Sequence, residues 1–207
     1  MGLSLVGMSL ASGVLQLPAL SRTAITGLGV VAIVLLIGLS AFFSSSEIAF
    51  FSLPQHRIES MVEEGIPNAE TVKALKEDPH RLLVTILVGN NIVNIAMSSI
   101  ATALFGLYVS QGQAVLAATF GITAVVLLFG ESAPKSYAVE NTESWALRIA
   151  NALKLSEYVL FPLIYVFDRL TRVVNSAMGS SSAIESPYVT RDEIKDIIET
   201  GEREGVI

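Results

Sequence analysis

One uncharged apolar run, residues 23–43, constrains the fold of this chain more than any other feature. A helix needs about 20 apolar residues to cross the hydrocarbon core of a bilayer. Two more apolar runs follow at residues 82–108 and 114–129, separated by a short uncharged turn. The sequence therefore predicts an all-α membrane protein, with three transmembrane helices in the lipid bilayer, juxtamembrane helices and a cytoplasmic helical tail.

Composition supports this class and excludes others. Hydrophobic residues make up 52% of the chain and charged residues 15%, against about a quarter charged in soluble domains. The absence of cysteine excludes disulfides and thiolate metal sites. The formal net charge of −6 leaves no basic surface of the kind that nucleic-acid binding needs. The sequence shows no nucleophile–base pair and no phosphate loop, so we do not expect an enzyme.

The segment between the first two spans is polar, and Pro54 ends the first helix. Within this segment, Gly65-Ile66-Pro67-Asn68 predicts a break between two short helices. Its bases, and those that follow the third span, contrast with the turn at residues 110–113, which has none. By the positive-inside rule, this multi-pass protein of the cell membrane has its amino terminus outside and its carboxyl terminus in the cytoplasm.

Residues 145–171 predict an interfacial helix pair. Their apolar part, residues 158–167, is too short to span a bilayer and contains Pro162. Its aromatic side chains suit the headgroup region. A fourth span that starts near Ala146 is the alternative.

Two units are expected along the chain. Residues 1–178 form the transmembrane domain with its juxtamembrane helices, and residues 179–207 form a linker and the start of an acidic cytoplasmic helix. Thr190 and Glu193 match a capping box at the start of that helix. Its amphipathic pattern is unfinished at Ile207, so we expect the native protein to continue.

Polar residues at membrane depth are costly, and each is therefore a functional candidate. The sequence Ser44-Ser45-Ser46-Glu47 continues the first span, and the second span contains Asn90, Asn91 and Asn94. At about 100° per residue, these asparagines share one polar stripe. Two alternatives stay open: serine hydroxyls can bond to their own helix, and asparagines can join membrane helices to one another.

A third cluster combines Gly130 and Glu131 with Pro134. Proline has no N–H, so it frees the carbonyl of Gly130 beside the Glu131 carboxylate. Broken helices of this kind line ion sites in transporters. The alternative is a helix that ends here with a solvated Glu131. Together the clusters offer only oxygen donors, which suit Mg²⁺ or Ca²⁺.

Three motifs, in this order and at these spacings, resemble the CNNM/CorC (cyclin M) family of magnesium transporters. They are Ala41-Phe42-Phe43-Ser44-Ser45-Ser46-Glu47 (FFS-x-x-E), Val88-Gly89-Asn90-Asn91-Ile92-Val93-Asn94 (GN-x-x-x-N) and Phe129-Gly130-Glu131-Ser132-Ala133-Pro134-Lys135 (GE-x-x-PK). The resemblance covers nearly the whole chain after residue 25. It implies a homodimer with three transmembrane helices that exports Mg²⁺, with Na⁺ coupling in some members.

The resemblance also implies a ligand set. The expected metal ligands are Ser44, Asn90, Asn94 and Glu131, with backbone carbonyls near Gly130, and Asn91 is the alternative to Asn90. ATP is expected only through nucleotide-binding CBS modules, which this chain does not contain. The leading functional hypothesis is therefore Mg²⁺ transport. Its alternatives are a membrane-anchored regulatory scaffold that responds to Mg²⁺ or nucleotide, and a passive cation channel.

Overall fold

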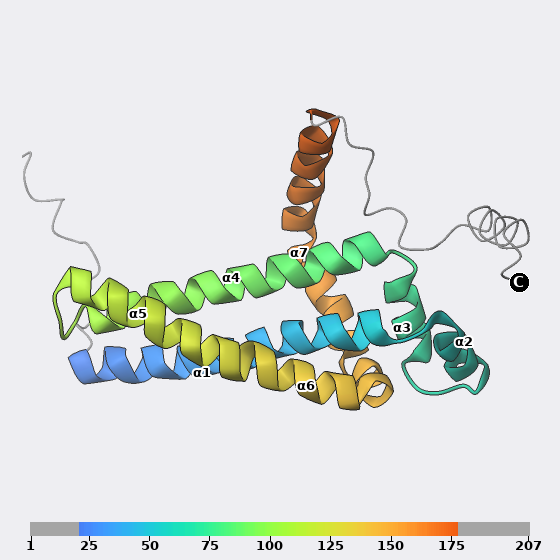
Figure 1. Ribbon diagram of the computed structural model, residues 1–207, viewed down its shortest axis with the longest axis horizontal. Helices are drawn as coiled ribbons and strands as arrows, with labels where there is room; N and C mark the ends of the chain where they lie inside the picture. Colours follow the sequence, from blue (N-terminus) through green and yellow to red (C-terminus); the bar gives the residue numbers. More distant parts are fainter. Residues whose placement is uncertain (1–20, 178–207) are drawn as a thin grey trace, which may run out of the picture.

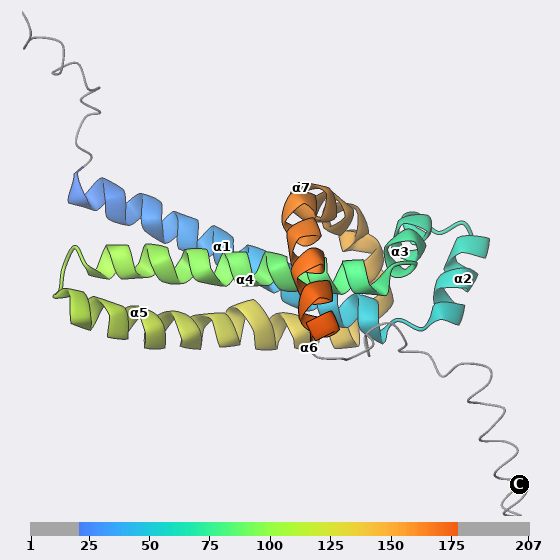
Figure 2. The ribbon, with the colours of Figure 1, turned by 90° about the horizontal axis from the view of Figure 1, so that it is seen from above.

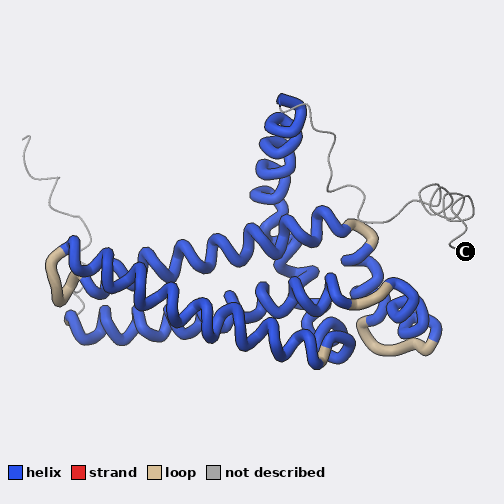
Figure 3. The backbone as a smooth tube through the Cα atoms, in the orientation of Figure 1, coloured by secondary structure: helices blue, strands red, loops and turns tan. Residues whose placement is uncertain are grey.

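The structure is a computed structural model that describes residues 21–177. In this part of the chain, helices are joined by short loops and turns, and there is no strand (Figure 3). The elements in order are α1 (Arg22–Ser52), α2 (Gln55–Glu63), α3 (Ala69–Lys76), α4 (Pro79–Phe105), α5 (Gln111–Val125), the π-helical η1 (Val126–Ser132), α6 (Ala133–Glu140) and α7 (Thr142–Ala177). The linker and acidic helix expected over residues 179–207 lie outside the described residues.

Three long helical runs lie along the long axis of the molecule: α1, α4 and the continuous run α5–η1–α6 (Figures 1 and 2). Near the α4–α5 turn, α4 lies between α1 and α5, and toward the other end α1 contacts η1 and α6. We call that second end, where α2 and α3 lie, the α2–α3 end. Each run is long and apolar enough to cross a membrane, as the sequence predicts.

Helix α7 corrects one prediction. In place of an interfacial helix pair, residues 142–177 form a single helix with Pro162 inside it. Its part Thr142–Phe167 is a fourth segment long and apolar enough to span a membrane. However, α7 runs across the three long runs and not alongside them (Figures 1 and 2). A proline removes one backbone donor and clashes with the preceding turn, and such a defect is tolerated where neighbouring helices or water satisfy the freed groups.

The expected helix boundaries in the polar segment are confirmed. Helix α1 ends at Ser52, and Pro54 occupies the position before α2. Gly65 and Asn68 both adopt left-handed backbone conformations, with φ of 68° and 69°, and they separate α2 from α3. Lys76 of α3 then donates to the carbonyl oxygen of Leu53 at 2.6 Å, which places a cation at the negative end of α1.

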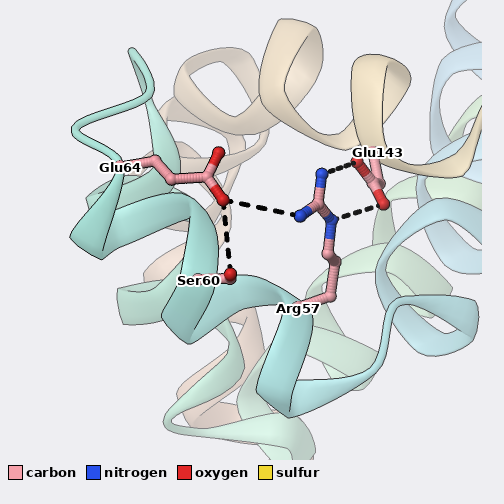
Figure 4. A network of polar contacts seen from close by, with 4 residues as sticks. All are labelled: Arg57, Ser60, Glu64 and Glu143. Atoms are coloured by element: carbon pink, nitrogen blue, oxygen red, sulfur yellow. Dashed lines mark hydrogen bonds and ion pairs between the residues drawn. The ribbon is translucent and has the colours of Figure 1, made fainter.

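Polar contacts attach the first half of α7 to the juxtamembrane helices. The guanidinium of Arg57 on α2 binds both carboxylate oxygens of Glu143, at 2.7 and 3.0 Å, and also lies 3.7 Å from Glu64 (Figure 4). About two turns further along α7, Asn151 donates to Asn68 at 3.0 Å. These contacts all lie at the α2–α3 end.

The amino terminus of α4 also contacts α7. Arg81 forms an ion pair with Glu157 and lies 5.4 Å from the ring centre of Phe161. Polar partners therefore recur along α7, and Leu155, Tyr158 and Val159 are exposed on the side away from its buried residues. This two-sided character suits a helix between protein and lipid.

Candidate functional site

Polar side chains of α1 and α4 meet inside the bundle. The Ser40 hydroxyl, which is buried, lies 3.1 Å from Asn90 Oδ1 and 3.2 Å from Asn94 Oδ1. Asn90 and Asn94 are one turn apart on α4, so their amide oxygens converge on the same point. A hydroxyl carries one proton and each amide oxygen has two lone pairs, so both amide oxygens can accept from, or bind to, another partner.

Two glycines allow α1, α4 and η1 to approach one another closely around Ser40. A Cβ atom on Gly130 of η1 would lie 2.9 Å from Ser40 Oγ. A Cβ atom on Gly89 of α4 would lie 2.4 Å from Phe43 Cζ. Real Cβ atoms essentially never come this close to another atom, so a larger residue at either position would displace Ser40 or Phe43. The two glycines therefore bring α4 and η1 close to the polar face of α1.

Ser44 is one turn beyond Ser40 on the same face of α1. Its side chain is buried, and its hydroxyl has no hydrogen-bond partner within the described part of the chain. The neighbouring Ser45 and Ser46 differ, because both donate to the carbonyl of Phe42 in their own helix. A buried hydroxyl without a partner carries a desolvation cost, and a bound cation or water would remove it.

The third run is not broken at Gly130, which corrects the sequence prediction. It continues as helix from Gln111 to Glu140, and residues 126–132 widen into a π-helical turn. In this turn the amide of Ala133 donates to Leu128, five residues earlier. Pro134 explains the change, because it cannot form the bond that an α-helix would make to Gly130. Such π turns occur frequently at functional sites.

Glu131 is partly buried in this π turn. Its side chain forms no hydrogen bond or ion pair with any other residue that the structure describes. Its carboxyl group therefore has no cationic partner among the described residues, within a helix long and apolar enough to span a membrane. Such a group calls for a cation or for access to water.

The structure distinguishes the two candidate asparagines. Asn90 and Asn94 face Ser40, whereas Asn91 is exposed on the outer side of α4. The sequence left this choice open, because it does not give the rotation of α4 relative to its neighbours. Sequence reasoning also missed Ser40, which lies inside an apolar run. Its spacing of four residues from Ser44 was the available signal.

The arrangement can bind a small hard cation. It combines a free hydroxyl and two amide oxygens with the backbone of the π turn at Gly130, and Glu131 follows Gly130 in that turn. No group of three or more His, Cys, Asp or Glu side chains that could hold a metal occurs within residues 21–177. A site here would thus depend on neutral oxygens and one carboxylate, a set that suits Mg²⁺ or Ca²⁺ better than zinc or copper.

Comparison with known proteins finds a matching family and several related membrane proteins. Residues 31–207 match the family described as the cyclin M transmembrane N-terminal domain. The chain is 32% identical over 162 residues to the UPF0053 inner membrane protein YfjD of Escherichia coli, which covers 77% of this chain and 37% of that protein. It is 34% identical over 176 residues to a chloroplastic DUF21 domain-containing protein of Arabidopsis thaliana, covering 83% of this chain and 26% of the relative.

A further relative has a functional name. The polyamine export protein of Escherichia coli is 28% identical over 190 residues, covering 86% of this chain and 42% of the relative. The chain thus spans about a quarter to two fifths of the length of the curated relatives it matches.

Proposed function

We propose that this chain, which belongs to the cyclin M transmembrane-domain family, forms the membrane part of a Mg²⁺ transporter. One observation carries the proposal: the buried Ser44 hydroxyl has no partner and lies one turn from the point where Ser40 meets Asn90 and Asn94. Glu131, from the third helical run, would supply a full negative charge. Oxygen ligands from three helices are what a dehydrated divalent cation requires.

Ser44, Asn90, Asn94 and Glu131 would bind the ion, and backbone carbonyls near Gly130 would complete its shell. An octahedral arrangement at about 2.0–2.1 Å is needed, and Mg²⁺ gives up its water reluctantly. A single carboxylate offsets only part of that cost. The ion must also leave again, which favours a site of modest affinity.

The space between the helices favours a small ion over a polyamine, the substrate in the name of one relative. The room beside Gly130 does not admit even a methyl group without moving Ser40. A polyamine is elongated and carries several ammonium groups, which would call for several carboxylates. Glu131 is the only acid among the expected ligands. Polyamine export nevertheless provides a direct alternative in the transport assay.

The orientation of α7 supports three spans over four. α7 runs across the other long helical runs, and one side of it holds Glu143, Asn151 and Glu157 in polar contacts. A helix that crosses the bundle in this way suits the inner surface of the membrane. The amino terminus would then lie outside and the carboxyl terminus in the cytoplasm, with a second copy of the chain beside α4.

Mg²⁺ flux in proteoliposomes that contain the full-length protein tests the proposed function. We expect Mg²⁺ to leave loaded vesicles faster than from protein-free vesicles, and we expect spermidine not to. An imposed Na⁺ gradient separates coupled transport from a passive channel, since only coupled transport runs uphill. Absence of Mg²⁺ flux with and without the gradient would refute the proposal and favour the regulatory scaffold.

A further inference from the structure

We propose that Glu47 is a second cation contact, at the α2–α3 end of the seam between α1 and α6, and that Lys135 occupies it when no cation is present. This inference rests on the proposed function and extends it to the path of the ion. The Lys135 ammonium lies 2.9 Å from Glu47 Oε2. The ion pair joins α1 to α6 directly along the side of the candidate site.

The placement of the pair follows from helix geometry. Ser40, Ser44 and Glu47 fall within about 60° of one another on α1, at 100° per residue. Glu47 is seven residues beyond Ser40, a distance of about 10 Å along the axis. On the neighbouring run, Lys135 is five residues beyond Gly130, which contacts Ser40. On both helical runs the ion pair therefore lies nearer to the α2–α3 end than Ser40 and Gly130 do.

Exposure distinguishes this pair from the site itself. The side chains of Glu47 and Lys135 are 35% and 37% exposed, whereas Ser44 is 2% exposed. A hydrated cation can therefore reach the Glu47 carboxylate before it loses its water. The unpartnered Ser44 hydroxyl lies three residues further into the bundle. It offers the next oxygen ligand along the same face.

A lysine paired with this carboxylate has a defined effect on a divalent cation. Lys135 neutralises Glu47 while the path is empty, and an arriving cation of higher charge competes with the ammonium for the same oxygen. The displaced Lys135 then repels the cation electrostatically at the α2–α3 end of the seam. Glu47 thus favours capture of the ion, and Lys135 opposes it and favours release.

This role predicts that neutralising Glu47 and neutralising Lys135 change the KM for Mg²⁺ in opposite directions. In flux assays on the full-length protein, Glu47→Gln should raise the KM for Mg²⁺ on the α2–α3 side by roughly threefold to tenfold. Lys135→Gln should lower that KM by a similar factor. Both effects should shrink at high ionic strength, because the pair is partly exposed. Glu47→Asp keeps the carboxylate and should stay near the wild-type KM.

The alternative is that the pair is only a tether between α1 and α6. A tether predicts that Glu47→Gln and Lys135→Gln shift KM in the same direction, or not at all, and either result would overturn the inference. Glu157→Gln is the matched control, since it breaks an ion pair between α4 and α7, away from this seam. Mg²⁺ flux by the wild-type protein distinguishes the two proposals. If the wild type shows no flux, the proposed function and this inference both fail. If it does, a shift of both variants in the same direction refutes only this inference.

Discussion

Gly130 leaves room for the hydroxyl of Ser40, since a Cβ atom at position 130 would lie 2.9 Å from Ser40 Oγ. The same hydroxyl lies within 3.2 Å of two amide oxygens on α4. Three helices therefore pack closely around this one hydroxyl. A small displacement of Ser40 changes the geometry of every oxygen around it.

Gly130→Ala tests this dependence. The added methyl group should displace Ser40 by a few tenths of an ångström and weaken Mg²⁺ binding on the order of tenfold, with little loss of folded protein. Calorimetric titration of the purified variant measures the effect. Gly121→Ala on α5 is the control, because nothing lies within 4 Å of its Cβ position. Equal affinity in the two variants would contradict a cation site beside Gly130.

Cysteine labelling tests the three-span topology, and the chain has no native cysteine to interfere. With three spans, Gln111→Cys should react from outside and Ser176→Cys from the cytoplasm. With α7 as a fourth span, both should react from outside. A membrane-impermeant maleimide on intact cells and on inverted vesicles separates the outcomes. Labelling of both residues from one side would reject the three-span arrangement.

The exposed face of α4 predicts where a second copy binds. Asn91 and Ser98 are exposed there, together with Leu87 and Ile95. An amide at membrane depth gains from a partner across an interface, by about 1 kcal/mol. Asn91→Leu should therefore lower the fraction of dimer in nanodiscs, measured by single-molecule mass. Phe120→Leu, on the exposed side of α5, should leave it unchanged. An unaltered dimer fraction in Asn91→Leu would place the interface elsewhere.

The contact between Lys76 and the end of α1 predicts a pH dependence. Burial lowers the pKa of Lys76 from its ordinary value of 10.5. The unfolded chain then keeps this proton to higher pH than the folded protein does. This residue's contribution to the free energy of unfolding should therefore rise with pH between the lowered pKa and 10.5, and stay constant below that window. Melting temperatures of wild type and Lys76→Met across this range test it, and parallel curves would contradict it.

The helices were predictable because lipid imposes a simple rule on composition and length. The runs that became α1, α4 and α5 are apolar enough to follow that rule, and Gly65 and Asn68 marked the break between α2 and α3. α7 was not predicted as one helix. A proline normally ends a helix in a sequence pattern, and the pattern around Pro162 does not show the neighbours of α7.

The site was predictable in part. The residue types indicated oxygen ligands, but only the packed helices show that Asn90 faces inward and Asn91 outward. Ser40 was missed because one serine in an apolar run usually bonds to its own helix. The π turn was missed as such, although Pro134 signalled that the α-helical bond to Gly130 was lost. Rotation about a helix axis is a property of contacts between helices, which a single sequence does not contain.

The most direct test of the central claim compares Mg²⁺ flux and Mg²⁺ binding in wild type and Glu131→Gln. This change keeps the shape and one oxygen of the side chain but removes the only full charge among the proposed ligands. We predict that Glu131→Gln folds, keeps the melting temperature and oligomeric state of wild type, and loses both binding and flux. Wild-type flux from folded Glu131→Gln would contradict the account.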